Sequence, residues 1–203
     1  QKLSGETEAE IHKIMIMGGS RIAIRISSYA PDNMAIKLIE CDKQKSYKLA
    51  EYMNDIIIIQ GDGRNVDLLK EEGIRDMDAF IALTDSSETN ILACLTAKEL
   101  GVKKTIAEVE NIQFISTAER LNIGNIINKK LLAASRIFQL LLDEDSSNAK
   151  CLALSDAEVV ELVAKENSKI TKAAVKDLKL PSDLTIGGLV RNGHGMVVTG
   201  NTW

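Results

Sequence analysis

The sequence has few of the residues that recognise nucleic acid. Aromatic residues make up only 3% of its 203 positions, and its 25 lysines and arginines form no block. They are outnumbered by 29 aspartates and glutamates, so the net charge is −4. Single strands need aromatic side chains on which bases stack, and duplexes need a clustered basic surface. We therefore expect no nucleic-acid partner.

Cysteine and histidine are equally scarce. His12 and His194 lie far apart in the sequence, and Cys41, Cys94 and Cys151 are scattered and odd in number. Neither set has the spacing of a metal site, and unpaired thiols are typical of a reducing compartment. No apolar run approaches the roughly 18 residues that span a bilayer, and no stretch has the pattern of a signal peptide. The sequence thus predicts a cytoplasmic protein with no metal site.

Short apolar runs alternate with amphipathic segments along most of the chain. With 45% apolar and 27% charged residues, the composition is that of a globular protein with one good core or two small domains. The predicted strands lie at residues 14–17, 35–40, 56–59, 79–84, 105–109 and 125–127. The predicted helices lie at residues 21–30, 43–53, 66–72, 88–100, 114–121 and 131–142. Strands joined by helical crossovers form a parallel sheet, so the sequence predicts a Rossmann-like, doubly wound α/β fold.

Two of these segments are unusually apolar. Residues 56–59 are four isoleucines in succession, which predicts a strand buried on both faces of the sheet. The helix at 131–142 is apolar over more than one face, which is too much for a helix that only covers a sheet. It is either deeply buried or in contact with a partner subunit, and the residues leave both alternatives open.

The turn at residues 18–20 is the centre of the candidate site. Gly18, Gly19 and Ser20 lie between a predicted strand and a predicted helix, which is the context of a dinucleotide-binding fingerprint. Gly18 can take the tight bend, and the first amides of the helix carry the positive end of its dipole toward a phosphate. Ser20 stands where the fingerprint has its second glycine, and Ala23 is a tolerated replacement for the third. The Ser20 hydroxyl either crowds the phosphate or donates to it.

An acidic residue follows at the expected distance. Glu40 ends the second predicted strand about 20 residues after the first glycine, where a carboxylate accepts hydrogen bonds from a ribose diol. The alternative is a solvated strand end, with Asp42 capping the next helix. The loops at 61–63 and 84–85 follow other strands of the same parallel sheet, so we expect them at the same edge.

The chain changes character after an acidic, serine-bearing stretch at residues 143–148. Beyond it, strands are predicted at 151–154, 159–164, 185–190 and 196–199, a helix at 171–178 and a hairpin turn at 191–195. We therefore predict a linker or cloning remnant at 1–10, a nucleotide-binding domain at 11–142, and a small, partial α+β domain at 149–203. A domain of that size needs further chain or another subunit to complete it.

Five motifs occur in order along the first predicted domain. They are Ile-Met-Ile-Met-Gly-Gly-Ser-Arg-Ile, Ile-Glu-Cys-Asp, Gly-Asp-Gly, Ala-Leu-Thr-Asp and Asn-Ile-Leu-Ala. In this order they resemble the TrkA family of cytoplasmic Trk potassium-uptake regulators and their RCK domains. The resemblance covers about residues 12–142 for the nucleotide-binding lobe, and the segment from about 149 resembles the start of the carboxyl-terminal lobe.

The resemblance implies a non-catalytic, cytoplasmic regulatory subunit at the inner face of the membrane. It would bind NAD(H), or ATP, ADP or AMP, form a homo-oligomer of two or more copies, and attach to a membrane-embedded potassium channel subunit. By the same resemblance Arg21 would reach the phosphates, residues 61 and 62 would flank the adenine, and residues 84 and 85 would line the far end. The predicted cofactor-binding residues are Gly18, Gly19, Ser20, Arg21, Ile22, Glu40, Cys41, Asp42, Gly61, Asp62, Gly63, Thr84 and Asp85.

The alternative function is that of an NAD(P)-dependent oxidoreductase. Hydride transfer to a carbonyl usually needs a tyrosine or histidine beside the nicotinamide as proton donor. Tyr29, Tyr47 and Tyr52 lie in or after predicted helices, and none has a lysine four residues on. The sequence therefore favours binding without catalysis, and a scaffold whose site no longer binds is the third possibility.

Overall fold

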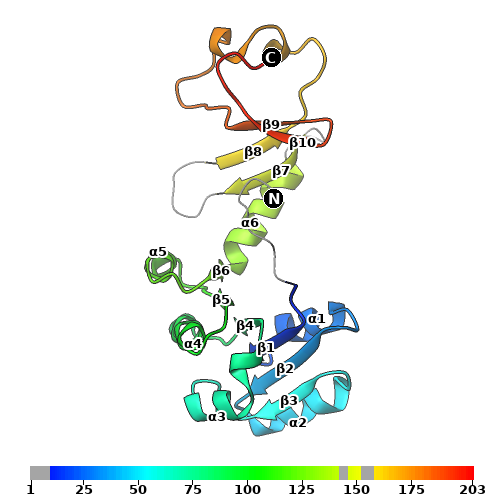
Figure 1. Cartoon of the computed structure of the whole chain (residues 1–203), viewed down its shortest axis with the longest axis vertical. Helices are drawn as coiled ribbons and strands as arrows, with labels where there is room; N and C mark the ends of the chain where they lie inside the picture. Colours follow the sequence, from blue (N-terminus) through cyan, green and yellow to red (C-terminus); the bar gives the residue numbers. More distant parts are fainter. Residues whose placement is uncertain (1–9, 142–145, 152–157) are drawn as a thin grey trace. The chain divides into compact units, whose positions relative to one another are not determined.

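The computed structural model describes residues 10–141, 146–151 and 158–203 of the chain (Figure 1). The chain forms two compact units, the first running from the amino terminus to Arg136 and the second holding most of the chain from Ile137 to Trp203. The domain boundaries predicted from the sequence stay a prediction. The predicted linker lies almost wholly outside the described residues, and so does half of the predicted boundary at 143–148.

The first unit is built on one parallel sheet of six strands. The strands are β1 (Lys13–Met17), β2 (Ala35–Glu40), β3 (Ile57–Gln60), β4 (Ala79–Ala82), β5 (Lys104–Glu108) and β6 (Asn125–Ile127). Their order is β3-β2-β1-β4-β5-β6, so the chain reverses direction across the sheet between β1 and β4. This arrangement confirms the predicted Rossmann-like α/β fold, and the reversal is the switch point at which such folds bind ligands.

Helices cover both faces of this sheet. They are α1 (Arg21–Tyr29), α2 (Lys43–Tyr52), α3 (Val66–Glu71), the 3₁₀ turn η1 (Ile74–Asp76), α4 (Ser87–Glu99) and α5 (Ile112–Arg120). Helix α6 (Lys129–Leu141) follows β6, and the boundary between the two units falls within it, after Arg136. Alternate side chains of a strand point to opposite faces, so the core has two layers. Met15 and Phe80 pack with α4 and α5 on one face, whereas Ile16 and Leu38 pack with α1 and α2 on the other (Figure 1).

Helices α1 to α5 each begin shortly after a strand ends, at a polar residue that caps the first turn. The caps are Ser20, Asp42, Asn65, Ser86 and Asn111. Each side-chain oxygen accepts a hydrogen bond from an amide that has no partner inside the helix. Because the strands are parallel, all five caps lie at the carboxyl edge of the sheet.

The prediction of a fully buried strand at 56–59 is wrong. The strand begins one residue later, at Ile57, which is 56% exposed. Strand β3 is the edge of the sheet and, among the described strands, pairs only with β2. Branched side chains favour an extended backbone at an edge as well as at a centre, so an isoleucine run predicts a strand but not its position in the sheet.

Helix α6 is not deeply buried. Leu132, Ile137 and Leu140 are all exposed, Leu140 to 71%. The first of the two alternatives left open by the sequence is therefore wrong for the side chains that the structure describes. None of the helices in the described ranges combines the length and the apolar content that a membrane crossing requires.

The second unit contains two antiparallel pairs of strands. Strand β7 (Ser146–Cys151) pairs with β8 (Glu158–Leu162), and β9 (Gly188–Arg191) pairs with β10 (His194–Val197). The predicted hairpin is confirmed, because Asn192 and Gly193 both have positive φ, as a two-residue hairpin turn requires. Of the strand predicted at 151–154, Cys151 is the last residue of β7, and residues 152–154 lie outside the described part of the chain.

The predicted helix at 171–178 is also wrong. Two short 3₁₀ turns, η2 (Lys169–Thr171) and η3 (Val175–Asp177), take its place. The amides of Val175 and Lys176 donate to the carbonyl oxygens of Thr202 and Gly200. Those long-range bonds use the donors that a continuous helix would need, so tertiary pairing overrides the local pattern.

Candidate functional site

The turn after β1 is fixed by close contacts with its neighbours. Gly18 has φ of +96°, and its amide donates to the carbonyl oxygen of Ile39, 2.8 Å away. A Cβ on Gly18 would lie only 2.9 Å from the carbonyl oxygen of Leu83 at the end of β4. Glycine is needed here twice over, for the backbone angle and for the approach of the two loops.

Gly19 brings the turn against β2 and α2. Its amide donates to Oε2 of Glu40 at 2.9 Å. A Cβ on Gly19 would meet that oxygen at 2.9 Å and the Leu49 side chain at 2.4 Å. The glycine that permits a close approach to the carboxylate is therefore Gly19, whereas the sequence pattern assigns the second glycine position to Ser20.

At the start of helix α1, three residues make different contacts, Ser20, Arg21 and Ile22. The Ser20 hydroxyl accepts from the amide of Ala23 at 3.3 Å and still has its own O–H to donate. Arg21 is exposed and makes no hydrogen bond or ion pair with any described residue. Ile22 is half-buried, and its side chain packs against the core on the face of the sheet that α1 and α2 cover.

Glu40 is the buried acid of this edge, with 4% of its surface exposed. Its Oε2 accepts from Gly19 and lies 2.8 Å from Nζ of Lys45, and its Oε1 accepts from the amide of Asp42 at 3.0 Å. Burial works to raise the pKa of Glu40, but the hydrogen bonds from Lys45, Asp42 and Gly19 outweigh it and hold the pKa below its usual value. The carboxylate is therefore charged and fully engaged.

Cys41 and Asp42 connect Glu40 to the next helix. The Cys41 thiol is exposed and donates to Oε1 of Glu40 at 3.5 Å. Lost hydration and the neighbouring carboxylate raise the pKa of this thiol. Asp42 accepts from the amide of Lys45 at 2.7 Å, so the capping role offered as an alternative by the sequence is confirmed.

The loop after β3 lies beside the same edge. The Gly61 amide donates to the carbonyl oxygen of Glu40 at 3.0 Å, and a Cβ on Gly63 would lie 2.4 Å from the Met17 side chain. Asp62 forms a bidentate pair with Arg64, whose hydrogen bonds lower the pKa of that carboxyl. The pairing of Asp62 with Arg64 was not predicted from the sequence.

Asn90 positions the loop after β4, and sequence reasoning gave it no role. Its Oδ1 accepts from the Thr84 amide at 3.0 Å and from the Thr84 hydroxyl at 2.6 Å, and its Nδ2 donates to the carbonyl oxygens of Thr84 and Glu108. Asn90 is fully buried, while Asp85 is exposed. Its position in the first turn of the helix predicted at 88–100, at the start of the Asn-Ile-Leu-Ala motif, was the signal that could have identified it.

A second acidic cluster, also unpredicted, lies where β5 and β6 end. Nζ of Lys129, the first residue of α6, lies 2.6 Å from Oε1 of the buried Glu108 and 3.6 Å from Oε1 of Glu110. The hydrogen bond to Glu108 raises the pKa of Lys129. This contact ties the start of α6 to the sheet edge.

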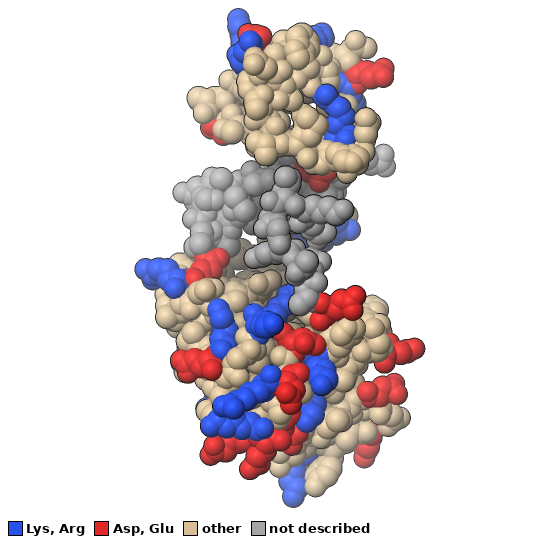
Figure 2. All heavy atoms as spheres, viewed as in Figure 1, with Lys and Arg blue, Asp and Glu red and all other residues tan. Residues whose placement is uncertain are grey.

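The carboxyl edge thus gathers most of the predicted side chains and backbone groups. Gly18, Gly19 and Glu40 are in direct contact, residues 61–63 contact β1 and β2, and Thr84 lies against Gly18. Figure 2 shows acidic and basic side chains interspersed over one face of the first unit. The amides of the turn and the cations Arg21 and Lys45 can bind phosphate, and the buried carboxylate of Glu40 can bind hydroxyl groups. The edge can therefore hold a ligand that carries both.

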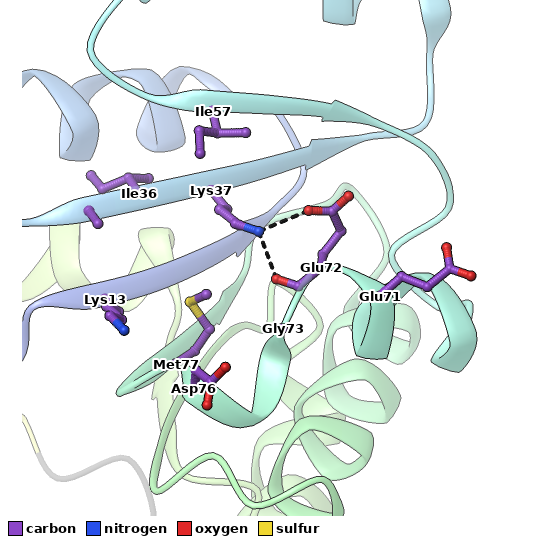
Figure 3. A pocket seen from close by; sticks show the side chains of 10 residues that line it. Lys13, Ile36, Lys37, Ile57, Glu71, Glu72, Gly73, Asp76 and Met77 are labelled. Carbon is purple, nitrogen blue, oxygen red and sulfur yellow. Dashed lines mark hydrogen bonds and ion pairs between the residues drawn. The ribbon is translucent and has the colours of Figure 1, made fainter.

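A pocket of about 300 Å³ lies at the opposite edge, by the amino ends of β1, β2 and β3 (Figure 3). Lys37 lines it and donates to the carbonyl oxygen and the carboxylate of Glu72, at 2.8 and 2.9 Å. Ile36, Ile57 and Met77 contribute apolar surface. The pocket contains none of the predicted site residues.

Comparison with known protein families matches residues 14–129 to the TrkA-N domain. Among curated proteins, the Trk system potassium uptake protein TrkA of Vibrio alginolyticus is 32% identical over 198 residues, which are 96% of this chain and 43% of that protein. The chain spans about two fifths of the length of the curated relatives that it matches.

Solved structures share the fold. A structure described as the GsuK channel bound to NAD has a TM-score of 0.56 and 15% identity, covering 65% of this chain and 24% of that one. A structure of GsuK bound to ADP also has a TM-score of 0.56 and 15% identity, covering 64% and 35%. At these identities the similarity establishes the fold of the first unit.

Proposed function

The chain belongs to the TrkA-N domain family, and on that premise we propose that it is part of a regulatory subunit of a Trk-type potassium uptake channel. The subunit binds NAD(H) or an adenine nucleotide and performs no catalysis. The observation that carries the proposal is the glycine turn, held by the buried carboxylate of Glu40 at the switch point of the sheet. A glycine turn, a helix amino terminus and a ribose-binding acid are the parts of a dinucleotide site.

The proposed ligand lies across the carboxyl edge. Its phosphates bind the turn at Gly18–Ser20 and the exposed guanidinium of Arg21, with Ile22 contributing its amide. The ribose diol binds Glu40, near Cys41 and Asp42. The adenine lies along residues 61–63, and Thr84 and Asp85 line the far end. These residues come from four loops whose mutual contacts hold them together without ligand.

Two features favour NAD(H), ATP, ADP or AMP as the ligand. The solved structures that share the fold are described as bound to NAD in one case and to ADP in another. The acid at the end of β2 suits a free ribose diol, because a 2′-phosphate at that position would be repelled by Glu40. We therefore propose adenine nucleotides without a 2′-phosphate.

The oxidoreductase alternative finds no favourable observation. Tyr29, Tyr47 and Tyr52 are all exposed on helices, and His12 lies at the amino edge of the sheet, opposite the candidate site. A proton donor for hydride transfer has to lie beside the nicotinamide. Binding without turnover is the function that we propose.

Assembly completes the proposed mechanism. The exposed apolar residues of α6 pack against a second copy of the chain, so the regulator is a homo-oligomer of two or more copies. It is cytoplasmic and attaches at the inner face of the membrane to the channel subunit. Nucleotide binding then favours one arrangement of the copies by its differential affinity for the two arrangements.

Titration with NADH, followed by nicotinamide fluorescence, tests this function, with ATP, ADP and AMP as competitors. The proposal predicts saturable binding and no oxidation of NADH when carbonyl compounds are added. Turnover would establish the oxidoreductase instead. Failure of all four nucleotides to bind would remove the proposed function.

A further inference from the structure

Lys45 occupies the solvent side of the buried carboxylate. Of the groups that contact Glu40, the amides of Gly19 and Asp42 belong to the backbone, and the Cys41 thiol is a neutral donor on the adjacent residue. The remaining partner is the ammonium of Lys45, 2.8 Å from Oε2, whose side chain is 49% exposed. It is the partner that an incoming ligand can displace.

The same lysine lies over the glycine turn. Its Cε lies 3.5 Å from the position that a Cβ on Gly19 would take. It reaches there from the first turn of α2, on a flexible four-carbon stem. The ammonium is therefore adjacent both to the proposed ribose acid and to the proposed phosphate turn.

A ribose diol can replace Lys45 without leaving Glu40 unpaired. A buried carboxylate is strongly destabilised when it loses its partners, so any ligand that moves the ammonium has to supply donors in its place. The two hydroxyls of a ribose diol are such donors. The displaced ammonium then needs an anion, and the ligand's phosphate is the anion at this turn.

We propose that Lys45 is an exchangeable counterion of the nucleotide site, a role that rests on the proposed function. In the free protein its ammonium pairs with Glu40, and in the complex it pairs with the phosphate while the ribose diol takes its place. The site therefore selects ribonucleotides that carry both a free diol and a 5′-phosphate. An unphosphorylated nucleoside is disfavoured, because it displaces the lysine and offers it no anion.

Calorimetric affinities for ADP and adenosine test the exchange in the parent and in two variants of α2. Lys45→Met removes the ammonium, and Lys48→Met, at an exposed position of the same helix, is the matched control. We expect Lys45→Met to lower the ratio of ADP to adenosine affinity by about tenfold or more, where tenfold corresponds to about 1.4 kcal/mol. ADP should bind more weakly and adenosine more tightly, while Lys48→Met should keep the parent's ratio.

Two further variants keep the test decisive if Lys45→Met does not fold. Lys45→Gln still donates to Glu40 but has no charge for the phosphate, so it should also lower the ratio of ADP to adenosine affinity. Lys45→Arg should keep the parent's ratio. An unchanged ratio in the folded Met or Gln variant would overturn the role of Lys45 and leave nucleotide binding intact. A parent protein that binds neither ADP nor adenosine would also overturn this inference, and one that in addition fails to bind NADH, ATP and AMP would overturn the proposed function.

Discussion

At the scale of single residues, Glu40 has two roles that depend on the same contacts. Its carboxylate is proposed to bind the ribose, and it also fixes the glycine turn at residues 18–20 by accepting a hydrogen bond from the Gly19 amide. A buried acid with several donors stabilises the fold only while it is ionised. The candidate site is thus part of what keeps the first unit folded.

The pKa of Glu40, held below its ordinary value of 4.5, predicts an acid-sensitive fold. The unfolded chain binds a proton at a higher pH than the native state, so this stabilisation is complete above about pH 4.5 and is lost as pH falls through the lower native pKa. We expect Glu40→Gln to lower the free energy of unfolding at pH 7 by about 1.5–3 kcal/mol, the range for hydrogen bonds to charged groups.

Urea denaturation at a series of pH values measures this effect. The difference in the free energy of unfolding between the parent and Glu40→Gln should become smaller below pH 4.5. Glu51→Gln, an exposed carboxylate of α2, is the control and should stay within about 0.5 kcal/mol of the parent. A gap that stays constant through the acid range would show that the ionised form of Glu40 contributes no stability.

A comparison of Gly18 with Gly101 distinguishes the two reasons for a glycine, which are a positive φ angle and a lack of space for a Cβ. Both have positive φ, but a Cβ on Gly18 would meet backbone atoms, whereas one on Gly101 would meet nothing within 4 Å. Gly101→Ala should cost about 1–2 kcal/mol for the backbone angle alone. Gly18→Ala should cost a further 1–3 kcal/mol or so, because the loop after β4 has to move. Equal losses in thermal denaturation would mean that the two loops do not approach closely.

At the scale of elements, the hydrogen bonds of Asn90 attach helix α4 to the carboxyl edge of the sheet. It bonds both the loop at Thr84 and the carbonyl oxygen of Glu108 at the end of β5. The cost of truncating it comes from the backbone groups that it would leave buried without partners.

Asn90→Ala should therefore lower the free energy of unfolding by about 1–3 kcal/mol. It should also weaken nucleotide binding, because the loop carrying Thr84 and Asp85 loses its anchor. Calorimetry with ADP and urea denaturation measure the two effects, with Glu99→Ala on the same helix as control. A loss of stability without any loss of affinity would leave this loop outside the site.

The elements that sequence patterns predicted well are those of the first unit. The six strands and the helices of the first unit lie within a few residues of the predicted bounds, because parallel strands and capped helices leave strong local signals. The failures have long-range causes. The edge position of Ile57 and the pairing of Val175 with the chain's last residues depend on partners far away in sequence.

The candidate site was predictable as a set of positions but not as a set of contacts. Parallel topology alone brings Gly18, Glu40, Gly61 and Thr84 to one edge. The ion pair of Lys45 with Glu40 joins residues whose charges are unremarkable in the sequence. The burial of Asn90 is likewise set by packing, which no local pattern records.

At the scale of the whole molecule, the exposed apolar residues of α6 predict self-association. Leu140 is among the most exposed of them, so Leu140→Asp should leave the chain folded. If another copy covers this helix, an unpartnered charge there is strongly unfavourable and the variant should sediment as a monomer. Leu92→Asp, at an exposed position of α4, is the control and should sediment as the parent does. A parent protein that is monomeric at high concentration would contradict the proposal.

The central claim is that the carboxyl edge of the sheet binds an adenine nucleotide. Amide chemical shifts of the ¹⁵N-labelled protein, recorded during titration with ADP, test it most directly because they report where the ligand lies. The account predicts saturable shifts concentrated at Gly19, Glu40, Gly61 and Thr84, with little change at Lys37 and Glu72 in the amino-edge pocket. Shifts concentrated around Lys37 and Glu72, or none at all, would contradict it.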